Sequence, residues 1–309
     1  FNINSSSNLI GNIGNTMLDK INNNKDYSVI ELSSFQLYWS HAIKVQLGVI
    51  VNIFPNHLNW HKTWSCYVQS KLKLLHAAER LVCSNGVKQY VDCPELQAKI
   101  SWVVDEQSLM SSDMDNLKLV AALPETLRVH ALIARQVADM VGIDRQTQAN
   151  TLTQFQPWPY RCQLESVKPG HWYNDAKSSN LAAARYALSN IHSKHGSKVV
   201  WIAGGLTKQE DFTQLGLWIG SYVEHAIVFG ADKMLFLDNI KGFCPVSPVD
   251  HLHDALVLAL QMTAADDVVV FSPAAASFDQ FENYMHRGQC FTELLQALVS
   301  ESSVDYNGC

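Results

Sequence analysis

The stretch that decides the fold is "DDVVVFSPAAASFDQFENYMHRG", residues 266–288. Its apolar start is typical of a buried strand, and its second half predicts an amphipathic helix that ends at Arg287-Gly288. Between the two lie Pro273, three alanines and Ser277. Small side chains at the start of a helix allow a close approach, either by a neighbouring strand or by a ligand.

The same alternation of short apolar runs and longer amphipathic ones recurs along the whole chain. Helical spacing is found in residues 66–81 and 128–143, and two prolines in "QPWPYR" (156–161) interrupt the pattern. Strands are expected at 27–34, 45–55, 80–84, 101–105, 171–176, 198–205, 225–230 and 266–273. We therefore expect an α/β protein with two doubly wound, mainly parallel-sheet domains, residues 1–157 and 158–309.

Composition excludes several classes of protein. The net charge is −6 and no run of Lys or Arg is present, which argues against a nucleic-acid partner. No apolar run approaches the ~18 residues of a membrane-spanning helix, so no membrane insertion is expected. Seven widely spaced cysteines favour reduced thiols in a cytoplasmic protein. Because the first residue is Phe, we expect the chain to be a piece of a longer protein.

Polar residues stand at the predicted carboxyl ends of the strands, where open parallel sheets bind their ligands. They are Glu31 and the segments 52–57, 174–180, 204–208 and 272–277. Taken singly, each has an ordinary alternative: Glu31 as a helix cap or ion-pair partner, and His57 as a loop histidine. Their joint placement favours a site.

Glu31 and His57 end neighbouring strands of the first expected domain. A carboxylate oxygen and an imidazole, together with water, suit Mg²⁺ or Mn²⁺. Lys71 follows His57 by 14 residues. By itself it is typical of a surface lysine whose apolar stem packs on the protein.

Seven motifs occur in the order found in the Mur ligases, and the chain resembles that family from about Gly11 to about Leu298. They are "IELSSFQL" (30–37), "NIFPNHLNWH" (52–61), "YVQSKLKLL" (67–75), "PYR" (159–161), "YNDAKSSNLAAARYAL" (173–188), "GGLTKQEDF" (204–212) and "SPAAASFDQFENYMHRG" (272–288). The first and last are most similar to the members that add D-glutamate. The resemblance implies a central ATPase domain followed by a Rossmann-like C-terminal domain that binds the amino acid.

The resemblance also implies roles for individual residues. Asn12 would meet the muramoyl substrate, and Arg161, Asp175 and His130 would bind ATP. Glu31 and His57 would hold magnesium, and Lys71 would be carbamylated to give a further carboxylate for the metal. The closed site would be lined by Lys177 and Ser179, and D-glutamate would be held by Lys208 and Ser277, with Phe278 and Tyr284 beside it. Of these, Lys71, His57 and Lys177 are the expected catalytic residues.

The implied reaction is ATP-dependent ligation of D-glutamate to UDP-N-acetylmuramoyl-L-alanine through an acyl phosphate, in cytoplasmic peptidoglycan precursor synthesis. ATP and two Mg²⁺ ions would take part, and the protein is expected to be a monomer.

Several features depart from the family pattern. The sequence contains no GxxxxGK[ST] loop to cradle phosphates, so we expect the chain as it stands to be an inactive fragment. His130 stands where the family has an adenine-binding Asn, Tyr284 where Phe is common, and Asn56 and Asn59 where acids are usual. Two alternatives stay open: another Mur ligase or folylpolyglutamate-type ligase, and a non-catalytic remnant that binds a partner or ligand.

Overall fold

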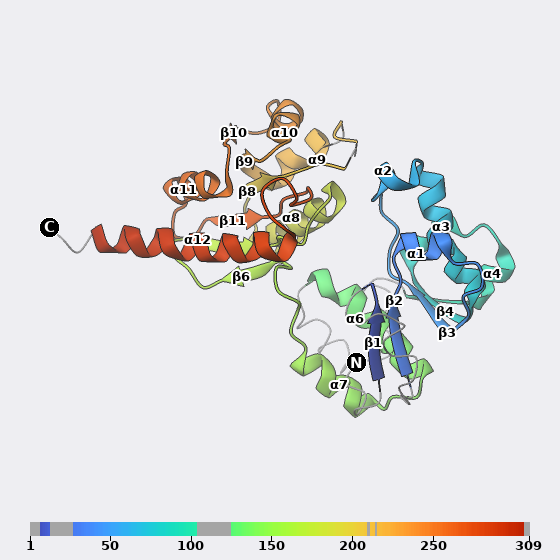
Figure 1. The fold of residues 1–309 in the computed structure, drawn as a ribbon. Helices are drawn as coiled ribbons and strands as arrows, with labels where there is room; N and C mark the ends of the chain where they lie inside the picture. The colour runs from blue at the N-terminus through green and yellow to red at the C-terminus, as the bar shows by residue number, and fades with distance from the viewer. Residues whose placement is uncertain (1–6, 13–26, 104–124, 209–210, 214, 306–309) are drawn as a thin grey trace. The chain divides into compact units, whose positions relative to one another are not determined.

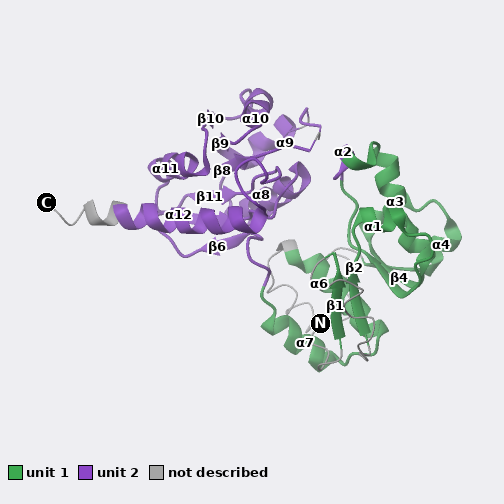
Figure 2. Cartoon of the chain, viewed as in Figure 1, with its two compact units in different colours: residues 1–54, 60–156 green, residues 55–59, 157–309 purple. Residues whose placement is uncertain are grey.

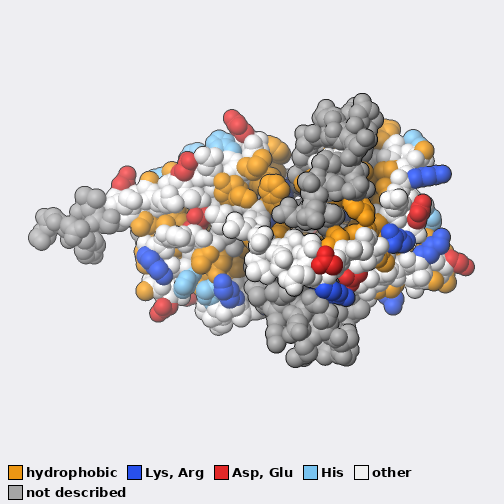
Figure 3. All heavy atoms as spheres, turned by 90° about the horizontal axis from the view of Figure 1, so that it is seen from below, with side chains coloured by type: hydrophobic (Ala, Val, Ile, Leu, Met, Phe, Trp, Pro, Cys, Tyr) orange, Lys and Arg blue, Asp and Glu red, His pale blue; other side chains and the backbone are white. Residues whose placement is uncertain are grey.

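The computed structural model describes residues 7–12, 27–103, 125–208, 211–213 and 215–305, and the chain divides into two compact units (Figure 1). Unit 1 comprises residues 1–54 and 60–156, and unit 2 comprises residues 55–59 and 157–309 (Figure 2). Both units are mixed α/β structures, as the alternation of apolar and amphipathic runs predicts. No helix among the described residues is long and apolar enough to cross a membrane. On the face drawn in Figure 3, basic and acidic side chains of the described residues are interspersed.

The described residues of unit 1 form two small parallel sheets. In the first, β1 (Ser7–Gly11) pairs with β2 (Tyr27–Glu31); the second has the order β3 (Val45–Ile50), β4 (Ala78–Ser84), β5 (Ile100–Val103). The helices are α1 (Ser34–Trp39), α2 (Leu58–His61), α3 (Trp64–Ala77), α4 (Pro94–Lys99), α6 (Glu125–Met140) and α7 (Arg145–Gln154), with a 3₁₀ turn at Asn85–Tyr90. The apolar face of α6 packs its buried Ala131, Leu132 and Ile133 against Val82 and Val103 of the second sheet. This packing explains why the helical spacing of residues 128–143 is so regular.

In unit 2, the part that the structure describes forms a six-stranded sheet in the order β10-β9-β8-β11-β7-β6. Its strands are β6 (Gln163–Glu165), β7 (His171–Asn174), β8 (Val199–Gly204), β9 (Val223–Phe229), β10 (Val246–Pro248) and β11 (Val268–Phe271). All pairs are parallel except β6 with β7. Its helices are α8 (Leu181–His195), α9 (Leu215–Tyr222), α10 (Lys233–Ile240), α11 (Leu252–Met262) and α12 (Tyr284–Asp305). Because β11 returns between β7 and β8, the strand order reverses there, and this is where open α/β sheets bind ligands.

Two hydrophobic layers enclose the sheet of unit 2. Alternate strand residues such as Trp201 and Val270 pack with α8, α9 and α10, whereas Ile202 and Phe271 pack with α11 and α12. Every residue of β8 and β11 is buried. A strand that is buried on both faces is apolar at every position, as in "VVWIAG" and "VVVF".

Several boundaries differ from the sequence expectations. The helix expected to end at Arg287-Gly288 begins instead at Tyr284 and continues to Asp305. The helix expected over 66–81 ends at Ala77, where β4 begins, and the strand expected over 45–55 ends at Ile50. The strand expected over 101–105 begins one residue earlier, and its last two residues lie outside the described part.

Candidate active site

The best-defined part of the site lies at the carboxyl ends of β7, β8 and β11 in unit 2. The loops that follow these strands are joined by backbone hydrogen bonds. Ala274 N–H donates to Ser178 O over 3.1 Å, and Leu206 and Ala276 form an isolated antiparallel bridge. Ala274 adopts a left-handed φ of 59°, which is uncommon for a residue with a Cβ. The loops after β7, β8 and β11 thus form one surface, and the small side chains of "SPAAAS" allow these loops to approach closely.

Asp175 is buried at this surface, directly after β7. Its Oδ2 accepts a hydrogen bond of 2.7 Å from Ser272 Oγ, and its Oδ1 accepts one of 3.2 Å from the Cys162 N–H. Burial raises the pKa of Asp175 to about 7, although these hydrogen bonds and the charge of Arg161 act in the opposite direction. Arg161 itself is exposed. The structure therefore groups Arg161 and Asp175, the two predicted ATP-binding residues of the second domain.

Two lysines reach this surface from different loops. Lys208 Nζ donates to Ser179 Oγ over 3.3 Å, and Lys177 Nζ lies 4.0 Å from the centroid of the Tyr284 ring. The second contact is within the range of a cation–π interaction. Ser277 is buried and Phe278 is 71% exposed. Ammonium groups beside hydroxyl groups are suited to a ligand that carries carboxylates.

In unit 1, Glu31 is the last residue of β2 and accepts a hydrogen bond of 3.0 Å from the Asn12 amide. Glu31 also acts on Lys71 of α3. Burial lowers the pKa of Lys71, and the negative charge of Glu31 opposes this effect. A lowered lysine pKa increases the fraction of neutral amine, the form that reacts with carbon dioxide. The structure therefore groups Asn12, Glu31 and Lys71.

Part of the "IELSSFQL" motif serves the local fold. Ser33 caps α1: its hydroxyl accepts from the Gln36 N–H at 3.2 Å, and the Gln36 side chain accepts from the Ser33 N–H at 2.8 Å. This reciprocal capping box starts helix α1 shortly after β2 ends at Glu31. The motif thus fixes where the carboxylate stands.

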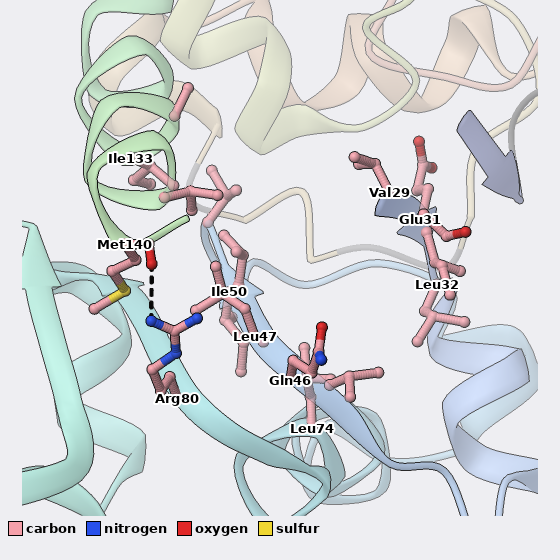
Figure 4. Close-up of a pocket in the computed structure, with 18 of the residues that line it drawn as sticks. Val29, Glu31, Leu32, Gln46, Leu47, Ile50, Leu74, Arg80, Ile133 and Met140 are labelled. Carbon is pink, nitrogen blue, oxygen red and sulfur yellow. Dashed lines mark hydrogen bonds between the residues drawn. The ribbon is translucent and has the colours of Figure 1, made fainter. Parts of the chain in front are cut away.

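A cavity of about 1540 Å³ lies within unit 1 (Figure 4). All residues of β2 and β3 line it, together with Lys71 and part of α6, including His130. Within the described residues, β2 pairs with β1 and β3 with β4, but β2 and β3 do not pair with each other. The cavity therefore lies between the two parallel sheets of unit 1, and Glu31 and Lys71 are among the residues that line it.

Two of the remaining predicted residues belong to a different unit from the residues they are expected to act with. His57 has a left-handed φ of 56° and lies in the segment 55–59, which is grouped with unit 2, whereas Glu31 and Lys71 belong to unit 1. His130 is exposed on α6 of unit 1, whereas Arg161 and Asp175 belong to unit 2. Among the described residues, no three His, Cys, Asp or Glu side chains are grouped so that they could hold a metal ion.

Sequence reasoning missed Arg287, which has no exposed surface and donates to two backbone carbonyls at the site. The signals were its place in the motif "SPAAASFDQFENYMHRG" and at the expected end of a helix, next to a glycine, but an arginine is usually exposed.

Two family models match the chain. The Mur ligase middle domain matches residues 4–97, and the Mur ligase glutamate ligase domain matches residues 160–275. Among curated proteins, the UDP-N-acetylmuramoylalanine–D-glutamate ligase of Francisella tularensis subsp. novicida is 31% identical over 299 residues, which are 95% of this chain and 70% of the relative. The protein of the same name from subsp. holarctica is 30% identical, with the same coverage.

Solved structures with the same fold share less sequence. MurF from Acinetobacter baumannii has a TM-score of 0.61 at 11% identity, covering 94% of this chain and 77% of its own. Mycobacterium tuberculosis folylpolyglutamate synthase, complexed with ADP, also has a TM-score of 0.61, at 14% identity and 87% and 68% coverage.

The two family models and the curated relatives define the class of protein as ATP-dependent ligases. The chain belongs to the Mur ligase family.

Proposed function

We propose that this protein joins D-glutamate to UDP-N-acetylmuramoyl-L-alanine at the expense of ATP. The observation that carries the proposal is the pair of lysines, Lys177 and Lys208, presented with serine hydroxyls by loops at the carboxyl ends of β7 and β8. D-Glutamate carries two carboxylates and the reaction forms phosphate, and two ammonium groups beside hydroxyl groups can neutralise negative charge on both the amino acid and the phosphate. The names of the relatives that match 95% of the chain support the same substrate.

In this proposal, Lys208 and Ser277 bind the carboxylates of D-glutamate, and Ser179 fixes the Lys208 ammonium through their 3.3 Å contact. Phe278 and Tyr284 form the wall of the amino-acid site. Lys177, held against the Tyr284 ring, provides positive charge where phosphate is formed. Asn12 binds the muramoyl substrate next to Glu31.

Arg161, Asp175 and His130 are proposed to bind ATP, and Glu31, His57 and Lys71 to hold two Mg²⁺ ions. The donor atoms in unit 1 are of the type that Mg²⁺ binds. Glu31 offers carboxylate oxygen, and the lowered pKa of Lys71 favours its conversion to a carbamate. Magnesium would neutralise phosphate charge during phosphoryl transfer.

The reaction then has two steps. The substrate carboxylate attacks the terminal phosphorus of ATP, which gives an acyl phosphate and ADP. The D-glutamate amine attacks the acyl carbon, loses a proton and expels inorganic phosphate, which leaves an amide. The protein contributes chiefly by holding the amine close to the acyl carbon and by stabilising developing negative charge.

The 309 residues contain no GxxxxGK[ST] sequence, so we propose that this chain alone does not turn over ATP. We further propose that the protein acts as a cytoplasmic monomer. The test is phosphate release by a protein extended through the upstream reading frame, with MgATP, UDP-N-acetylmuramoyl-L-alanine and one amino acid at a time. D-Glutamate should support turnover where L-glutamate and D-alanine do not. Equal turnover with another amino acid, or with a folate acceptor, would reject this assignment.

A further inference from the structure

Arg287 is the fourth residue of α12, and its side chain is completely buried. Its Nη1 donates to Ala275 O over 3.0 Å, and its Nη2 donates to Ala176 O over 2.9 Å. A guanidinium is planar and directs its N–H donors in a fixed fork. The two carbonyl oxygens are therefore held at a distance that the fork sets.

The two carbonyls belong to loops with predicted site residues. Ala176 immediately precedes Lys177, and Ala275 lies two residues before Ser277. These loops follow β7 and β11, which are neighbouring parallel strands. Arg287 thus joins the loop that carries Lys177 to the loop that carries Ser277.

A third loop also packs against this side chain. A Cβ added at Gly205, which directly follows β8, would lie 3.3 Å from Arg287 Nη1 and would collide with Ala276 O. Gly205 has a φ of +125°, which further favours glycine at this position. The loop of Lys208 therefore begins in close contact with the Arg287 fork.

Packing alone does not account for a buried arginine. A buried cation that hydrogen-bonds only to carbonyls loses its hydration, and an apolar side chain of similar size generally stabilises a core as well or better. Burial lowers the pKa of Arg287 to about 10, and the charges of Asp279 and Asp175 oppose this effect, so the group stays charged at neutral pH. Its Nε has no hydrogen-bond partner among the described residues, which adds to the cost. A role in holding the two loops at a fixed spacing explains why the protein tolerates this cost in stability.

We propose that Arg287 is a positioning residue of the amino-acid site: its guanidinium sets the spacing between the Lys177 loop and the Ser277 loop, so that Ser277 can bind a dicarboxylic amino acid next to the charge of Lys177. This inference rests on the proposed function for its ligand, but the bridge itself is independent of that function.

The first test uses hydrogen exchange in the 309-residue chain. Arg287→Lys keeps the charge but cannot present the fork, and Arg287→Met removes the charge. Both should raise amide exchange at 176–178 and 274–276 by tenfold or more, with little change in β8 and β9. Tyr173→Phe is the matched control, because it removes hydrogen bonds to His195 and Lys194 from a residue of β7 without touching either loop. No change in the loops, or a uniform rise throughout unit 2, would overturn the proposal.

The second test uses the protein extended through the upstream reading frame. Arg287→Lys should raise the KM for D-glutamate by tenfold or more and leave the KM for UDP-N-acetylmuramoyl-L-alanine within about twofold. An unchanged KM for D-glutamate would show that Arg287 supports only the fold. If the parent protein releases no phosphate with D-glutamate, the proposed function fails, and hydrogen exchange alone decides whether Arg287 bridges the loops. If Arg287→Met does not fold, Arg287→Lys carries both tests.

Discussion

Ser272 Oγ donates a hydrogen bond of 2.7 Å to Asp175 Oδ2, and it thereby joins the first residue after β11 to the first residue after β7. Both residues are buried, so the bond connects the two strand ends beneath the loops that carry Lys177 and Ser277. A buried carboxylate with few partners is costly when it is charged. This relationship makes the stability of unit 2 sensitive to pH.

Asp175→Asn should therefore flatten the pH dependence of unfolding. The pKa of Asp175 is raised from 3.8 to about 7 in the folded chain, so the folded state binds more protons than the unfolded state between these values. The free energy of unfolding should fall as pH rises from 4 to 7, by at most ~4 kcal/mol from this group. Asn keeps an acceptor for Ser272 but does not titrate. Urea unfolding at pH 4.5 and 7 measures the difference.

Asp238→Asn is the matched control, because Asp238 is exposed and pairs with Lys241 on the surface. Its effect on stability should be small, because exposed ion pairs contribute little. The account of Asp175 is wrong if Asp175→Asn changes stability equally at both pH values.

Gly288→Ala should destabilise the chain although it lies in a helix. Alanine is usually better than glycine in a helix by ~1 kcal/mol. Here the added methyl would lie well inside van der Waals contact of the Tyr160 ring, and Gly288 O also accepts a hydrogen bond from Asn174. We expect a net loss of ~1–3 kcal/mol in urea unfolding. Gly242→Ala, where nothing lies within 4 Å, is the control. A more stable Gly288→Ala protein would show that the Tyr160 loop is not packed there.

Sequence reasoning was reliable for the buried strands and for the fold class. The apolar runs within 198–205 and 266–273 predicted buried strands, because burial on both faces of a sheet leaves no polar position, and the strands are found at 199–204 and 268–271. The alternation of strands and helices likewise predicted the fold class. The glycine at 288 was wrongly interpreted as the end of a helix, since only the Tyr160 ring packed against it explains a glycine within α12.

Other features depend on tertiary contacts and could not be predicted. The three-residue strands β6 and β10 are too short for any periodicity, and they exist because a neighbouring edge is available. Arg287 is of a residue type that is usually exposed, and its burial becomes evident only when Ala176 and Ala275 are brought together. The predicted residues Asp175, Lys177, Lys208 and Ser277 share one end of a sheet because parallel strands place their carboxyl ends together.

Lys71 should carry a carbamate if its proposed role is correct. With ¹³C-bicarbonate and Mg²⁺, the extended protein should show a carbamate carbon signal that Lys71→Ala lacks. Lys71→Ala should lose most ligase activity, and acetate should restore part of it by supplying a carboxylate in the vacated space. Lys71→Arg should not respond, because a permanent cation fills that space. Full activity of Lys71→Ala, or of Lys71→Arg, would mean that Lys71 is an ordinary partly buried lysine.

Lys208→Ala and Ser277→Ala should mainly weaken the use of D-glutamate. Loss of a hydrogen bond to a charged group costs ~1.5–3 kcal/mol, so the KM should rise roughly tenfold to a hundredfold. Lys194→Ala is the matched control, because this lysine donates to Tyr173 away from the loops. The assignment fails if the KM for D-glutamate is unchanged in both variants, or if only the KM for ATP changes.

The most direct measurement of the central claim is the release of inorganic phosphate by the protein extended through the upstream reading frame, with MgATP and UDP-N-acetylmuramoyl-L-alanine, before and after D-glutamate is added. We predict release that requires D-glutamate, matches the amide formed one for one, and is not supported by L-glutamate. Release that is independent of D-glutamate, or no release when ATP and both substrates are present, would contradict the account.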